Sequence, residues 1–286
     1  MNYLKTAALL AVLSALLVFF GSALGGRQGA IMALVFAGLM NFISYWFSDK
    51  IVLAMFRAKK VDEASAPELH SSIRDLTMKA GMPMPKVYIM ENDTPNAFAT
   101  GRNPEHGAVA VTTGIMKLLT KEELKGVLAH ELSHIRNRDI LISTIAATIA
   151  GAISYLSHIA YYAAIFGGRS SRDDDRGGNP IALIVMMVVA PVAAMVVQLA
   201  ISRGREYAAD SGGAGMLGNP LPLAEALKKL EYYNKRIPMR LSNGSAAHMF
   251  IVSPLSGGSL LKLFSTHPPV AERVKRLEAM VGQIRA

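Results

Sequence analysis

Four long apolar runs divide the chain, and polar segments of mixed pattern follow the second run and the fourth run. A bilayer core about 30 Å thick requires about 20 consecutive apolar residues in a helix. Each run meets that requirement with few or no charges, and neighbouring runs pair naturally into two transmembrane hairpins, residues 1–48 and 140–201. The four runs are Thr6–Leu24, Gly29–Phe47, Ile140–Phe166 and Ile181–Ile201.

Some of these spans have alternative interpretations. With Lys5 ahead of it and small residues at its end, the first run also fits a cleaved signal peptide. The second run follows after a short gap and ends in Tyr45 and Trp46, aromatic residues typical of the membrane interface, which favours a hairpin. The third and fourth runs also fit buried helices of a soluble core, although their length and lack of charge favour the membrane.

The polar segments, residues 49–139 and 202–286, predict a globular domain assembled from two parts of the chain. In the first part, the stretch APELHSSIRDLTMKAGM has apolar positions at helical spacing and ends at Gly81. Three short runs between turn residues predict strands, at Lys86–Met90, Asn96–Thr100 and Gly107–Gly114. The expected fold is therefore mainly α: an integral membrane protein with four transmembrane helices and an α+β domain.

The distribution of basic residues predicts the orientation. The formal net charge is +9, and residues 202–286 contribute 12 basic minus 6 acidic residues. Arg57, Lys59 and Lys60 follow the second run, whereas three Arg balance three Asp in Gly167–Pro180. Basic residues gather on the cytoplasmic side of membrane proteins, which places both termini and both polar segments in the cytoplasm, against the lipid bilayer. We find no nucleic-acid-binding motif among these basic residues, and we expect no nucleic-acid partner.

A candidate metal site begins at the stretch LAHELSHIRNRD. The chain has no cysteine, so histidine and carboxylate are the ligands left for a catalytic metal. Thr120 and Glu123 form a capping-box pattern ahead of apolar residues at helical spacing. On such a helix His130, Glu131 and His134 fall within an arc of about 100°, so both imidazoles can reach one ion and Glu131 a water beside it. The alternative is a charged, solvated helix face.

A third ligand is needed for a catalytic site. Glu206 and Asp210 follow the fourth apolar run and lie four residues apart, on one face of a helix. Glu206 can then bind the metal while Asp210 holds the far nitrogen of a ligating histidine. A plain charged helix next to the membrane has the same spacing, and spacing alone favours it.

Four motifs in order, HELSHIRNRD, SRGREYAAD, NAFATG and STHPPVAER, give the chain a family resemblance along essentially its whole length. It resembles the HtpX-type membrane zinc metalloproteases of bacteria and, more distantly, the CAAX prenyl proteases. The resemblance implies a cytoplasmic zincin-like domain of the gluzincin type. It also implies one Zn²⁺ per chain, held by His130, His134 and Glu206, with Glu131 as the general base.

The same resemblance implies further site residues. Asp210 corresponds to a carboxylate that supports a metal ligand, and His267 with Arg273 to a pair that acts on the transition state. Asn96, together with Ala97 and Phe98, corresponds to an edge strand that holds the substrate backbone.

The function implied is hydrolysis of peptide bonds in membrane proteins, particularly damaged ones, at the bacterial inner membrane. The chain has no Walker-type motif, so turnover is expected without an ATPase in this chain. A protease that processes one specific precursor is one alternative, and a non-catalytic, zinc-containing membrane scaffold is another. Glu131 speaks against the scaffold because a structural site needs no general base.

Overall fold

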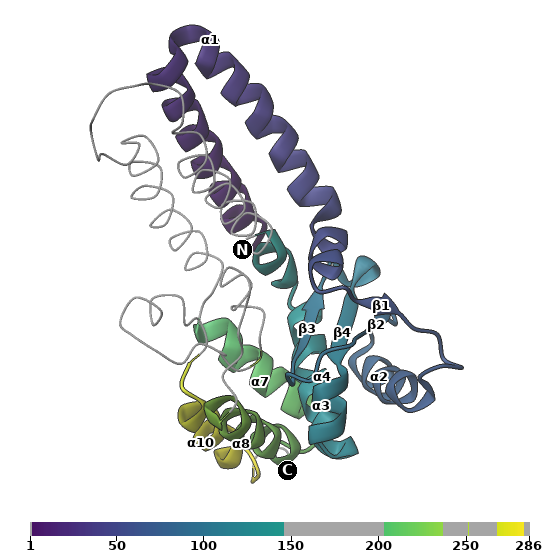
Figure 1. Cartoon of the computed structure of the whole chain (residues 1–286). Coiled ribbons are helices and arrows are strands. Elements are labelled where there is room, and N and C mark those ends of the chain that lie inside the picture. Colours follow the sequence, from purple (N-terminus) through teal and green to yellow (C-terminus); the bar gives the residue numbers. More distant parts are fainter. Residues whose placement is uncertain (1, 146–202, 237–250, 252–267, 283–286) are drawn as a thin grey trace, which may run out of the picture.

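The computed structural model describes residues 2–145, 203–236, 251 and 268–282, and Figure 1 shows their arrangement. The helices are α1 (Asn2–Met55), α2 (Pro67–Ala80), the 3-10 helix η1 (Pro104–His106), α3 (Thr113–Leu118), α4 (Lys121–Arg136), α7 (Arg203–Leu217), α8 (Leu221–Arg236) and α10 (Val270–Ala279). The strands are β1 (Lys59–Lys60), β2 (Lys86–Met90), β3 (Ala97–Thr100) and β4 (Ala108–Thr112).

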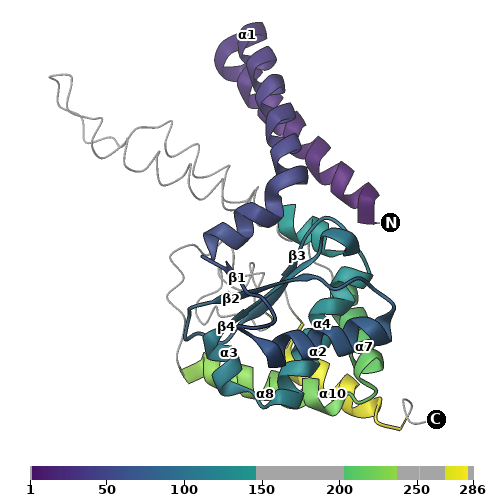
Figure 2. The same cartoon turned by 90° about the vertical axis from the view of Figure 1, so that its right-hand side faces the viewer.

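Helix α1 folds back on itself, and its two arms run in opposite directions above the sheet and the helices around it (Figures 1 and 2). Gly26, between the arms, has φ of 55°, a left-handed conformation that glycine adopts without strain. The Asn41 side-chain amide donates a hydrogen bond of 2.9 Å to the Ser14 hydroxyl. In one straight helix these two residues would lie about 40 Å apart. The first two apolar runs therefore form the helical hairpin that their spacing predicts.

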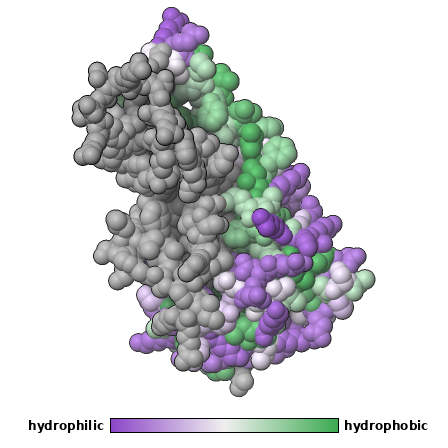
Figure 3. Space-filling view, in the orientation of Figure 1, coloured by the Kyte–Doolittle hydropathy of each residue, from purple (hydrophilic) through white to green (hydrophobic). Residues whose placement is uncertain are grey.

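The second arm of α1 has the character of a membrane span. Among the described residues, Gly26–Met55 is the one helical segment long and apolar enough to cross a membrane. Figure 3 shows hydrophobic residues along the hairpin and mainly hydrophilic residues on the domain below it. Residues 146–202, which include most of the third run and all of the fourth, lie outside the described residues. The four-span arrangement and the cytoplasmic orientation stay predictions.

The four strands form a mixed sheet in the order β1-β2-β4-β3, which leaves β3 at one edge. β2 and β4 are parallel, and β3 runs antiparallel to β4. Side chains alternate between the two faces of a strand. Val109 and Val111 accordingly belong to the main core with α2 and α4, whereas Ala108 and Ala110 face a second, smaller core.

That second core joins the sheet to the end of α1. Val52 and Leu53 pack with Phe98, and the rings of Phe56 and Phe98 lie 5.1 Å apart. The helix continues to Met55, past the boundary expected at residue 48. The sheet is consequently fixed directly to the helix that carries the apolar span.

Local sequence signals identified several elements of the globular part. α2 ends at Gly81, which has φ of 62° and closes the helix with two backbone hydrogen bonds. The three predicted strands appear as β2, β3 and β4, each within a few residues of its expected ends. The predicted capping box is present at the start of α4.

Candidate metal centre

Helix α4 supplies three of the predicted site residues. The Thr120 hydroxyl accepts from the Glu123 backbone N–H, and the Glu123 carboxylate accepts from the Thr120 N–H, which fixes where the helix begins. Leu128, Leu132 and Ile135 are fully buried in the main core, so the rotation of the helix is fixed as well. The remaining face carries His130, Glu131 and His134 toward α7 and β3.

Helix α7 lies against α4 because a small residue permits close approach. A Cβ added at Gly213 would come within 2.8 Å of the His130 backbone nitrogen. Neither backbone could accommodate that contact, so glycine sets the spacing of the two helices at this point. Two turns earlier on α7, Glu206 is buried and reaches the histidines.

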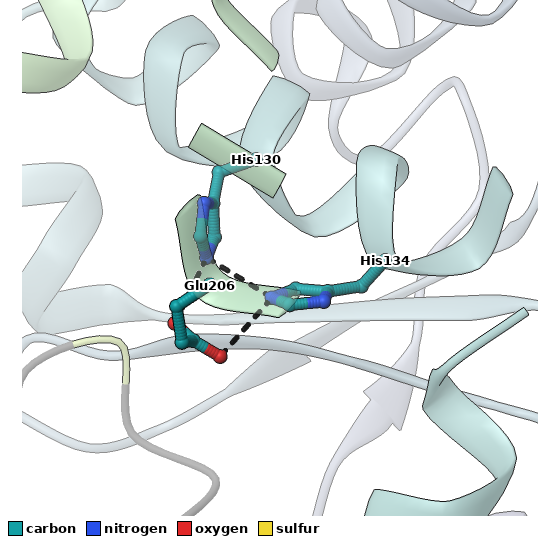
Figure 4. A group of neighbouring side chains, drawn as sticks. All are labelled: His130, His134 and Glu206. Carbon is teal, nitrogen blue, oxygen red and sulfur yellow. Dashed lines mark hydrogen bonds and ion pairs between the residues drawn. The ribbon is translucent and has the colours of Figure 1, made fainter. Parts of the chain in front are cut away.

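His130, His134 and Glu206 point toward one another, as Figure 4 shows. The Nε2 atoms of the two histidines are 3.1 Å apart. The Glu206 carboxylate oxygens lie 3.7 Å from His130 Nε2 and 3.6 Å from His134 Nε2. One ligand atom from each residue thus falls within 4.8 Å of the others, a group that could hold a metal ion.

Each histidine is oriented by its own carboxylate. Asp210 Oδ1 lies 2.9 Å from His130 Nδ1, and Asp139 Oδ2 lies 3.1 Å from His134 Nδ1. An Nδ1–H that donates to a carboxylate leaves the Nε2 lone pair free, which is the tautomer that binds metal. The two Nε2 atoms at 3.1 Å can share either a proton or a metal ion between them. The donor set therefore fits a metal ion.

The carboxylates around His134 favour a positive charge at this position. Burial alone would lower the pKa of His134, but the hydrogen bond and charge of Asp139, with Glu206 and Glu131 nearby, raise it to about 9. Without metal, the His134 ring is therefore protonated on both nitrogens at neutral pH. Metal binding must displace that proton.

Arg273 binds Asp210, the carboxylate that orients His130. Its Nε and Nη2 donate to the two oxygens of Asp210 at 2.9 and 2.7 Å, and its Nη1 donates to the Ile251 carbonyl at 3.0 Å. Burial alone would raise the pKa of Asp210, but the Arg273 guanidinium and the hydrogen bond from His130 hold it well below its usual range. Arg273 is fully buried, and its Nη1 also lies 3.9 Å from Glu206 Oε2, so it is next to two of the three ligand residues. Its expected action on the transition state stays a prediction.

Glu131 lies between the metal-ligand group and the edge strand. Its Oε2 accepts a hydrogen bond of 2.8 Å from the Ala99 backbone N–H of β3. Burial raises the pKa of the Glu131 carboxyl, against the opposing effect of His130 and His134. A carboxyl with a raised pKa, placed beside a metal site, is suited to exchanging protons.

The structure separates the residues expected at the edge strand. Asn96 is buried, and its Oδ1 accepts from the Ile251 N–H at 3.4 Å, while its Nδ2 has no hydrogen-bond partner among the described residues. The Ala99 N–H points away from β4, toward Glu131, and the alternation of hydrogen bonds along an antiparallel pair directs the backbone groups of Ala97 to the same edge. All four residues of β3 are buried. Phe98 instead directs its ring into the core beside Phe56, away from the edge. His267 lies outside the described residues.

Two contributors were not anticipated from the sequence. Asp139 orients His134, and its signal was its place at the end of HELSHIRNRD, five residues after that histidine. Gly213 sets the approach of α7, and its signal was the run of small residues SGGAG. Both depend on contacts between elements, which spacing within one element does not specify.

Comparison with known proteins supports the same interpretation. The model of peptidase family M48 matches residues 63–281. "Protease HtpX homolog" of Syntrophotalea carbinolica is 60% identical over 280 residues and covers 98% of this chain and 99% of the relative. The protein of the same name from Thermodesulfovibrio yellowstonii is 61% identical, with the same coverage.

A solved structure shares the fold. The crystal structure of S. mikatae Ste24p matches with a TM-score of 0.51 and 17% identity, covering 97% of this chain and 65% of that one. The family match, the near full-length relatives and the His130–His134–Glu206 group confirm the resemblance drawn from the motifs. The chain belongs to peptidase family M48 and is a membrane metalloprotease.

Proposed function

We propose that the protein is a zinc endopeptidase that hydrolyses membrane proteins, particularly damaged ones, at the cytoplasmic face of the bacterial inner membrane. One Zn²⁺ per chain is held by His130, His134 and Glu206. Two histidines and a carboxylate are a ligand set of catalytic zinc sites, in which a fourth position stays open.

One observation carries the proposal: the Glu131 carboxylate lies beside the metal-ligand group and touches the edge strand through Ala99. A structural metal site has no use for a fourth, protonatable group directed at the edge strand of a sheet. The backbone N–H and C=O of Ala97 face the same edge, where an extended peptide would add a strand and lie across the site.

The residues divide the chemical work. Zinc, when bound, would act as a Lewis acid that polarises a peptide carbonyl and lowers the pKa of a water molecule. Glu131 takes the proton of the attacking water on its carboxylate and then passes it to the leaving amine. Asp139 and Asp210 hold the two histidines in the ligating tautomer, and Arg273 holds Asp210. On the family resemblance, His267 stabilises the oxyanion.

The substrate class follows from where the sheet is attached. The end of α1 packs directly under the sheet that carries β3, so the edge strand stays close to the apolar span. A substrate segment leaving the bilayer meets the edge strand first. The chain has no ATP-binding motif, so we propose that it acts on segments that are already unfolded or extended.

The test uses full-length protein reconstituted in lipid vesicles without ATP. We would offer several unrelated membrane proteins, each in its native form and after heat unfolding, to wild type and to Glu131→Gln. We expect wild type to cut the unfolded forms of most substrates and Glu131→Gln to cut none.

Two outcomes would contradict the proposal. Cleavage of one substrate at one site, with the others intact, would indicate a precursor-processing protease. No cleavage by zinc-loaded wild type would favour the non-catalytic scaffold.

A further inference from the structure

A cavity of about 490 Å³ lies outside the metal centre, where the second arm of α1 meets the globular part of the chain. Its walls come from α1, from the start of β2 and from the turn that contains η1. Both aromatic and basic side chains line it, among them Trp46, Phe47, Lys50, Lys86, Arg102 and His106.

The aromatic side chains mark the depth of this cavity relative to the bilayer. Phe42 lies 6.3 Å from the Trp46 ring and 6.4 Å from the Phe47 ring, and Tyr45 lies 5.3 Å from Trp46. Trp46 and Phe47 are 45% and 41% exposed at the end of the apolar span. Tryptophan and tyrosine at such a position lie at the level of the lipid headgroups.

The basic side chains of the cavity lie next to these aromatic rings. The Arg102 guanidinium lies over the Trp46 ring at 4.5 Å and donates to His106 Nε2 at 2.9 Å. An arginine can only donate, so His106 Nε2 accepts from it, and His106 Nδ1 donates to Asn103 Oδ1 at 2.7 Å. These contacts orient Arg102, which forms no ion pair with an acidic residue in the described part of the chain.

Two lysines add to this charge. Lys50 is one turn beyond Trp46 and lies 5.3 Å from the Phe47 ring, and Lys86 lines the cavity from β2. Neither lysine forms an ion pair with any residue that the structure describes. Asp49 is the acidic residue of the lining, so three cations against one carboxylate leave a charge of +2.

We propose that this cavity binds the headgroup of an anionic phospholipid, with the phosphate among Arg102, Lys50 and Lys86. A basic pocket beside a membrane helix suits a lipid phosphate, and the exposed rings of Trp46 and Phe47 offer an apolar surface to the adjoining acyl chains. Free phosphate shares the charge but makes no use of that apolar surface. The proposal rests on the crossing of the bilayer by α1 and is independent of the peptidase chemistry.

Bound lipid would fix the height of the catalytic part above the membrane. The α1 segment that lines the cavity continues into Val52 and Leu53, which pack under the sheet. A headgroup held at Lys50 therefore sets the distance of β3 from the bilayer surface.

The experiment measures lipid bound to the purified full-length chain by native mass spectrometry. The probe is an equimolar mixture of phosphatidylglycerol and phosphatidylcholine in detergent. Lys50→Gln/Lys86→Gln removes two cations of the cavity, and Lys79→Gln/Lys275→Gln removes two exposed lysines elsewhere as a matched control. Thermal unfolding of both variants checks that each is folded.

We expect wild type and the control to retain phosphatidylglycerol in preference to phosphatidylcholine. The cavity variant should lose about 25-fold in affinity, because each basic residue near an anionic lipid contributes about fivefold. Equal retention of both lipids by wild type, or equal loss in both variants, would overturn the proposal. Displacement of the lipid by millimolar inorganic phosphate would overturn it too, and would assign the cavity to a free anion.

Discussion

The metal centre and the junction cavity use the same kinds of side chain in opposite surroundings. At the metal centre, His130, Asp210 and Arg273 are at most 3% exposed, and each is held by the next. At the junction, the Arg102 guanidinium packs on the ring of Trp46, which is 45% exposed. Lys50 and Lys86 have no carboxylate partner among the described residues. A buried polar atom without a partner costs free energy, so burial forces a fixed arrangement. Exposure leaves the junction cations available to a ligand.

Removing the buried cation should have the largest effect. Arg273→Ala leaves the Asp210 carboxylate without its partner in the core, and we expect a loss of about 3–5 kcal/mol in the free energy of unfolding. Arg276→Ala, on the same helix but exposed, should change stability little because its ion pair is screened by solvent. Thermal unfolding of the two variants checks this, and equal losses would contradict the contrast between buried and exposed cations.

A matched pair of glycines tests the approach of α7 to α4. Gly213→Ala places a Cβ against the His130 backbone, and we expect about 1–3 kcal/mol of destabilisation together with weaker metal binding. Gly215→Ala meets nothing within 4 Å, so it should stabilise the helix by about 1 kcal/mol. Chemical denaturation gives both values. If Gly213→Ala behaved like Gly215→Ala, the helix contact would not set the geometry of the site.

The two supporting carboxylates should contribute separately to metal affinity. Asp139→Asn and Asp210→Asn each weaken the orientation of one histidine, and we expect about a 10–100-fold loss of zinc affinity for each. Asp75→Asn, on the exposed side of α2, is the control. Competition with a zinc chelator measures the affinities, and an unchanged affinity in Asp139→Asn would remove this residue from the site.

The proton on His134 gives the most specific effect, because it is confined to one interval of pH. Its pKa is raised to about 9, so below that pH the metal must displace a proton that is absent above it. We expect zinc affinity to rise by about tenfold per pH unit between pH 7 and 9 and then to level off. If zinc affinity did not change between pH 7 and 9, His134 would not be protonated in the metal-free protein.

Local patterns predicted those parts of the molecule that depend on neighbours in the sequence. The capping box at Thr120, the end of α2 at Gly81 and the turn between the first two apolar runs each arise from residues within one turn of helix or one short loop. The pair His130 and His134 belongs to this group, because their spacing on one helix already places both on one side.

The remaining features depend on contacts between distant segments. Asp139 is adjacent to the motif, but its role requires the chain to turn back toward His134 after α4. Phe98 lies in the predicted strand, yet alternation along β3 sends its ring to the α1 side. The junction cavity joins residues near 50 with residues near 102, which no motif connects.

The central claim is that one metal, held by the His130–His134–Glu206 group, serves a peptidase whose base is Glu131. The most direct test is to strip the purified protein with a chelator, titrate zinc back, and record bound zinc and casein cleavage on the same samples. Wild type should gain activity that saturates at one zinc per chain, while Glu131→Gln should bind one zinc and cleave nothing. Cleavage by Glu131→Gln at the wild-type rate, or cleavage by metal-free wild type, would contradict the account.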